Sequence, residues 1–79
     1  LIRKQDWARV ATTLDWLITG APDISAWYKQ RALLRIELKQ NQAARKDLEK
    51  YLQLEPEATD RAQIEKQLQA IHTWLARLN

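Results

Sequence analysis

The chain has 79 residues, of which 46% are hydrophobic and 29% charged, and its net charge of +3 gives only a weak preference for polyanions. It contains no cysteine, which excludes disulfides, thiol nucleophiles and thiolate metal sites within the chain. Good helix formers dominate and there is a single glycine, so the predicted fold is all-α. No apolar run reaches the roughly 18 residues of a membrane span. The absence of cysteine suits the cytoplasm, which is the expected compartment.

The first predicted elements lie before Pro22. Residues 1–5 are predicted to end one helix, and Asp6 is predicted to cap the next, which runs to Gly20. Gly20 is expected to supply a left-handed exit, and Pro22 prevents the helix from continuing. The apolar side chains of this second helix recur at helical spacing: Trp7, Val10, Leu14, Leu17 and Ile18.

Two further helices are predicted before Pro56. Residues 25–38 form the first, capped by Asp23 or Ser25, and its apolar side chains lie on most faces, so we expect it in the middle of a stack. Residues 42–54 form the second, with Asn41 as its cap and Pro56 as its end.

The last predicted helix spans residues 60–78, and Thr59 or Asp60 can cap it. Its apolar stripe faces one side only: Ile64, Leu68, Ile71, Leu75 and Leu78. This pattern is typical of a helix that covers the end of a repeat array. The residues predicted to form the core of the whole chain are Val10, Leu14, Leu17, Ala32, Leu34, Ala44, Leu48, Tyr51, Leu68 and Ile71.

An internal repeat connects these helices, because Pro22 and Pro56 lie 34 residues apart and each follows a helix of the same pattern. Placing residues 1–24 on residues 35–58 keeps the apolar positions in phase, with Leu14 on Leu48 and Leu17 on Tyr51. A helical hairpin with a period of 34 is typical of tetratricopeptide arrays. The alternative, two unrelated amphipathic helices with prolines at a chance distance, is less favoured.

The chain resembles the tetratricopeptide repeat family. Ala32 and Ala44 stand where that family places small residues, and Leu48, Tyr51 and Pro56 match its second-helix core and closing proline. The resemblance implies a right-handed stack of antiparallel helix hairpins, divided into a partial repeat at 1–24, a complete repeat at 25–58 and a capping helix at 59–79. Lys39 and Asn41 depart from the family pattern, which usually has a glycine and an aromatic residue there.

A narrower resemblance is to the C-terminal repeat segment of SirB-type transglutaminase-like proteins. The runs that carry it are residues 29–34, 44–56 and 75–79. In that family the repeats follow a papain-like or transglutaminase-like domain with a catalytic cysteine, so no catalytic residue carries over to this chain. Because the chain begins at Leu1 rather than Met, we expect it to be a C-terminal fragment of a larger protein.

The family resemblance implies a non-catalytic protein-interaction or scaffolding module, and the residues themselves predict no cofactor, metal or membrane partner. A stack of this kind exposes a concave face lined by the first helix of each unit. Here that face is predicted to comprise Ala26, Lys29, Leu33, Ile36, Glu37, Gln63 and Gln67. An accessory domain of a transglutaminase-like or papain-like protein is one alternative. The N-terminal edge, left apolar by the partial repeat, is a second candidate surface, which would join two copies in a homodimer.

Arg31, Arg35 and Lys39 lie on one helical stripe, and Lys46 and Lys50 repeat the spacing. A weak polyanion site is one interpretation, but a solvated face balanced by nearby carboxylates is favoured, and nucleic acid is not the expected partner. Arg31 has a third interpretation, as a structural residue paired with Asp47 or Asp15.

Aromatic residues and the one histidine complete the candidates. Trp7 and Trp27 fit core positions. Trp16 and Trp74 are candidate anchors for a partner, although packed positions are favoured and Trp74 is expected to be the more exposed. His72 has no second histidine or cysteine with which to form a metal or catalytic site.

Overall fold

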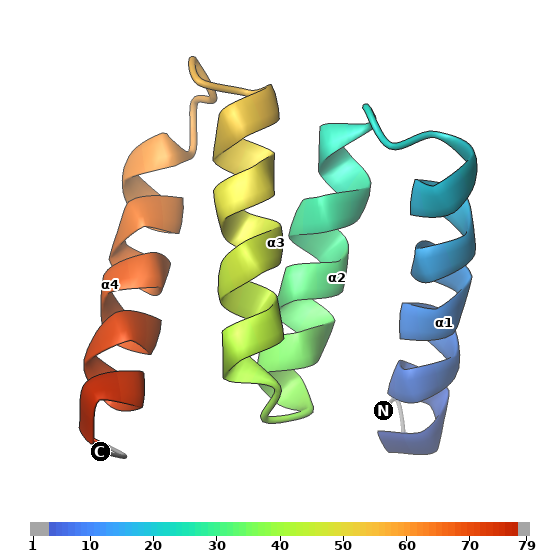
Figure 1. Cartoon of the computed structure of the whole chain (residues 1–79), viewed down its shortest axis with the longest axis horizontal. Coiled ribbons are helices and arrows are strands. Elements are labelled where there is room, and N and C mark those ends of the chain that lie inside the picture. Colours follow the sequence, from blue (N-terminus) through green and yellow to red (C-terminus); the bar gives the residue numbers. More distant parts are fainter. Residues whose placement is uncertain (1–3, 78–79) are drawn as a thin grey trace.

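The computed structural model describes residues 4–77, and within them every regular element is an α-helix. The helices are α1 (Lys4–Gly20), α2 (Ser25–Glu37), α3 (Asn41–Leu54) and α4 (Arg61–Arg77), and each lies antiparallel beside the next in chain order (Figure 1). The predicted all-α fold class, a stack of antiparallel helices, is therefore confirmed for the described residues. The closest packing joins α2 to α3, while α1 packs against α2 and α4 against α3.

The start of α1 differs from the expectation of two helices. The described part of α1 begins at Lys4, and Asp6 lies in its first turn rather than at a helix boundary. The predicted boundary at Asp6 is therefore wrong, because the helix continues through this residue. An acidic side chain in the first turn is stabilised by the positive end of the helix dipole. Residues 1–3 of the expected preceding helix, and Leu78 of the last stripe, lie outside the described residues.

The turn between α1 and α2 forms without a left-handed residue. Gly20 has no positive φ, and the amide of Ala21 still donates to the carbonyl of Leu17 at 2.9 Å, so α1 stays right-handed to its end. The predicted left-handed exit at Gly20 is therefore wrong. The N-cap of α2 is Ile24, which makes no side-chain capping bond, so neither Asp23 nor Ser25 is the cap.

The left-handed position occurs instead at Lys39, after α2, with a φ of 64°. There the amide of Gln40 donates to the carbonyl of Arg35 at 2.7 Å, and the amide of Lys39 donates to the carbonyl of Ile36 at 3.0 Å. These two bonds define a Schellman motif, in which a lysine occupies the position that glycine usually takes. Gln40 is the N-cap of α3, so the predicted cap, Asn41, is the first residue of that helix.

Both proline-containing connections lie at the same end of the molecule, at the top of Figure 1. The hydroxyl of Tyr28 donates to the carbonyl of Pro22 at 2.8 Å, and the guanidinium of Arg61 donates to the carbonyl of Pro56 at 2.7 Å. In each connection, a side chain from the next helix thus satisfies the proline carbonyl. This arrangement fits a 34-residue repeat, while the unit boundaries at 24/25 and 58/59 stay a prediction.

The core lies on both sides of α3. Ala32 of α2 and Ala44 of α3 are fully buried, and their small side chains let the two helices approach closely around Leu48. Of the residues expected in the core, the structure buries Leu14, Ala32, Ala44, Leu48, Tyr51 and Ile71, and it half-buries Leu34 and Leu68.

Val10 and Leu17 lie outside this core, contrary to the expectation. They are 42% and 40% exposed, because α2 is the one described helix that packs on α1 and these side chains flank its contact. The helical spacing was correct, but spacing alone does not state how many neighbours a helix has.

Candidate interaction surface

The predicted concave face is only partly assembled into one depression. Among its α2 residues, Ala26, Leu33 and Glu37 are exposed, whereas Lys29 and Ile36 are half-buried. On α4, Gln63 is exposed and Gln67 is half-buried, with its side-chain oxygen enclosed and unpartnered within the described residues. Of the seven residues predicted for this face, Ala26 and Lys29 line a common cavity.

That cavity has a volume of about 550 Å³ and lies between the first turns of α2 and the connection from α3 to α4. We call it the α2 groove. Its lining consists of Ser25, Ala26, Lys29, Gln30, Tyr51, Glu55, Glu57, Ala58 and Thr59. Most of these residues were absent from the predicted face, since the connection contributes four of them.

A cation and its partners occupy one wall of the α2 groove. The ammonium of Lys29 forms an ion pair with the carboxylate of Asp60 and lies 5.6 Å from the centre of the Tyr51 ring. The hydroxyl of Tyr51 donates to Asp60 at 2.8 Å. At the rim, the hydroxyl of Ser25 donates to Glu55 at 3.0 Å. The Lys29 ammonium thus interacts with both a carboxylate and the negative face of an aromatic ring.

These contacts shift two titrations. The hydrogen bond from Lys29, followed by that from Tyr51, lowers the pKa of Asp60 below its usual value. The hydrogen bond to Asp60, followed by burial, raises the pKa of Tyr51. Asp60 therefore stays ionised and Tyr51 stays neutral at physiological pH, which keeps one negative charge beside the groove.

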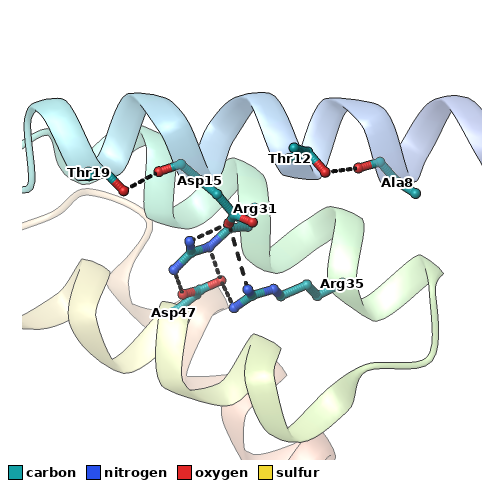
Figure 2. A network of polar contacts seen from close by, with 7 residues as sticks. All are labelled: Ala8, Thr12, Asp15, Thr19, Arg31, Arg35 and Asp47. Carbon is teal, nitrogen blue, oxygen red and sulfur yellow. Dashed lines mark hydrogen bonds and ion pairs between the residues drawn. The ribbon is translucent and has the colours of Figure 1, made fainter.

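A second charged cluster joins three helices (Figure 2). Asp47 of α3 is only 3% exposed and accepts two bonds from Arg31 of α2, at 2.9 and 2.7 Å, and a third from Arg35 at 2.9 Å. Arg31 also donates to Asp15 of α1 at 2.6 Å. The bond to Asp47 is the largest cause that raises the pKa of Arg31 above its already high usual value.

This cluster decides the role of the arginines. Arg31 pairs with Asp47 and with Asp15, as the structural interpretation proposed, and its guanidinium is mostly covered. Arg35 is engaged in the same way. The predicted basic stripe therefore loses two of its members to internal ion pairs, and the cations left exposed on it are Lys39 and Lys46.

The exposure of the tryptophan side chains differs from the expectation. Trp16 is 77% exposed and Trp74 is 42% exposed, so the prediction that Trp74 would be the more exposed is wrong. Trp16 lies on the side of α1 turned away from Leu14 and Ile18, where the described chain places no neighbour. Trp7 and Trp27 are half-buried, and Trp27 packs against the core.

A smaller cavity of about 340 Å³ lies between α3 and α4. His72 lines it together with Arg45, Glu49, Glu65, Leu68 and Gln69. Within residues 4–77 no three histidine, cysteine or carboxylate side chains converge in a metal-binding arrangement. Charges of both signs line this cavity, so it offers no clear preference for an ionic ligand.

The comparisons agree with this architecture. A family model described as tetratricopeptide repeat matches residues 1–69, and the chain belongs to that family. Searches of curated proteins and of solved structures returned no match. Tetratricopeptide repeats generally form protein-interaction modules without catalytic activity. None of the helices in residues 4–77 combines the length and the hydropathy that a bilayer crossing requires.

Proposed function

We propose that this chain is a non-catalytic interaction module that binds a segment of a partner protein along the predicted concave face of α2 and α4. The observation that carries the proposal is the α2 groove, a cavity of about 550 Å³ that includes Ala26 and Lys29 of that face. Leu33 adds an exposed apolar contact one to two turns further along α2. A family of interaction modules and a depression on the expected face point to the same function.

A peptide library displayed on phage and selected against the chain tests this proposal. Leu33 and Leu17 form a matched pair of variants, because both are leucines with about 40% of their surface exposed on different helices. We expect Leu33→Gln to weaken a selected peptide by about tenfold, the loss of roughly 1.4 kcal/mol that one apolar anchor supplies. Leu17→Gln should leave that peptide's affinity unchanged. Failure to select any peptide sensitive to Leu33→Gln contradicts the proposal.

The outer side of α1 supports a second interaction, between two copies of the chain. Trp16 is exposed on the face of α1 turned away from Leu14 and Ile18, Val10 and Leu17 are exposed on the flanks of the α2 contact, and exposed apolar side chains of this kind mark interaction sites. We propose that this edge forms a homodimer at high concentration. Sedimentation velocity should then show a concentration-dependent dimer that Trp16→Ala abolishes. A chain that remains monomeric at millimolar concentration contradicts this proposal.

Two sequence-based alternatives remain proposals of lower rank. An accessory role beside a transglutaminase-like or papain-like domain would be supported if the encoding reading frame contained such a domain. Weak polyanion binding would rest on Lys39 and Lys46, and it would have to disappear at high salt. A cytoplasmic location is likewise proposed from the sequence.

A further inference from the structure

We propose that the α2 groove receives a lysine or arginine side chain of the partner segment. This inference rests on the proposed function and specifies the chemistry of the bound segment. Its three supports are the charge of the groove, the cation that already lies in it, and the space left beside that cation.

The charge of the groove is opposite to that of the chain. Glu55 and Glu57 line it, and Asp60 pairs with Lys29 at its wall, so the groove and its wall hold three carboxylates and one ammonium. The whole chain carries a net charge of +3. A depression of one sign on a molecule of the other sign attracts a complementary charged group and repels an acidic one.

Lys29 shows how the groove holds a cation. Its ammonium pairs with Asp60 and lies over the Tyr51 ring, which are the two kinds of partner that proteins offer to a lysine or arginine. The Lys29 side chain is 36% exposed, so it can turn outward and release Asp60 to an incoming cation. Asp60 keeps its hydrogen bond from the Tyr51 hydroxyl when Lys29 turns away, and that bond also lowers the pKa of this carboxyl group.

Space and unmatched charge remain beside Lys29. The groove has a volume of about 550 Å³, and Ala26 and Ala58 give it short side chains on two walls. Glu55 accepts a bond from the neutral hydroxyl of Ser25, so its negative charge is not neutralised there. A second cationic side chain can therefore enter beside Lys29 or replace it on Asp60.

The test uses short dye-labelled peptides of alternating alanine and arginine, with an alanine–glutamate peptide as the comparison, and it measures anisotropy at physiological ionic strength. We expect the arginine peptide to bind more tightly than the glutamate peptide. Glu57→Gln should weaken the arginine peptide by about threefold, which is the effect of removing one exposed charge next to the bound cation. Glu49→Gln removes the same charge from an exposed site outside the groove, and it should change the affinity less.

The sign of the Lys29 effect separates this inference from its opposite. If Lys29 competes with the incoming cation, Lys29→Gln strengthens the arginine peptide by about threefold or more. Lys46→Gln removes one positive charge from the exposed side of α3 and controls for net charge, so it should have the smaller effect. Circular dichroism checks that each variant remains folded.

The results discriminate between this inference and the proposed function. Equal weakening by Glu57→Gln and Glu49→Gln, or a loss of affinity with Lys29→Gln, overturns the cation site. Selected peptides that need Leu33 but contain no lysine or arginine also overturn it, while the interaction surface itself survives. If no peptide of any composition depends on Leu33 or Glu57, both proposals fail.

Discussion

The strongest single prediction concerns Asp47, the buried carboxylate that holds Arg31 and Arg35. Asp47→Ala leaves both guanidiniums without their covered partner, and breaking a buried ion pair costs about 3–5 kcal/mol. Because both arginines reach the surface in part, we expect a value near the lower limit, about 3 kcal/mol. A chain of 79 residues is stable by roughly 4–12 kcal/mol, so this loss removes a large share of the total.

Asp15→Ala is the matched control, since Asp15 also accepts a bond from Arg31 but its side chain is 50% exposed. An exposed ion pair contributes only about 0–1 kcal/mol. Both free energies of unfolding are measured by urea titration followed by circular dichroism. In thermal scans, the loss of about 3 kcal/mol from a domain of this size lowers Tm by about 12–24 °C.

Burial is the reason for the difference between the two variants, so the ratio of their effects tests the argument. A loss below about 1 kcal/mol for Asp47→Ala would show that the arginines are fully rehydrated without it. Equal losses for both aspartates would show that covering the ion pair makes no difference. Arg31→Ala should resemble Asp47→Ala, because it removes the other half of the bidentate pair.

The remaining predictions concern the core, the helix ends at Gly20 and Lys39, and the α2 groove. Leu48→Ala should cost about 2–5 kcal/mol in urea titration, because Leu48 is fully buried. Gly20→Ala should gain about 0.4–1 kcal/mol, since an added Cβ meets nothing within 4 Å and φ is not positive. Lys39→Gly should gain about 0.5–1 kcal/mol by relieving the left-handed backbone, and a loss in thermal scans would contradict that reasoning. Asp60 has a lowered pKa, so its stabilisation is complete above the unfolded value near 4 and disappears as the pH falls through the folded value; Asp60→Asn should flatten this acid limb.

The sequence predicted the fold well, because the features that determine it are periodic. Ala44 and Leu48 recur at helical spacing and pack in one core with Ala32 of α2, and the two prolines mark connections at the same end of the molecule. The backbone conformation at the helix ends was harder to predict, because glycine adopts a left-handed conformation more easily than lysine and Gly20 was therefore the expected site. The hydrogen bonds of the Schellman motif, rather than residue preference, determine that Lys39 takes this conformation.

The candidate site was only half predictable. Ala26 and Lys29 follow from the position of α2 in the stack, but Glu55 and Glu57 belong to an irregular connection whose path the sequence does not specify. The sequence shows that three of residues 55–60 are acidic. That one of them pairs with Lys29 depends on how the connection packs against α2. The partial repeat predicted an apolar N-terminal edge, but the spacing of Val10 and Leu17 does not indicate that these two residues are the exposed ones.

The packing order of the helices gives the molecule an uneven resistance to opening. In the described chain α1 has a backbone neighbour only in α2, and α4 only in α3, whereas α2 and α3 are each held on two sides. Amide protons of the outer pair should therefore exchange with solvent through partial detachment, at a lower free energy than global unfolding. A segment bound in the α2 groove touches both α2 and the connection that leads into α4, and it would hold the detachable end in place. Protection factors in α4 would then report occupancy, although no side chain of that helix lines the groove.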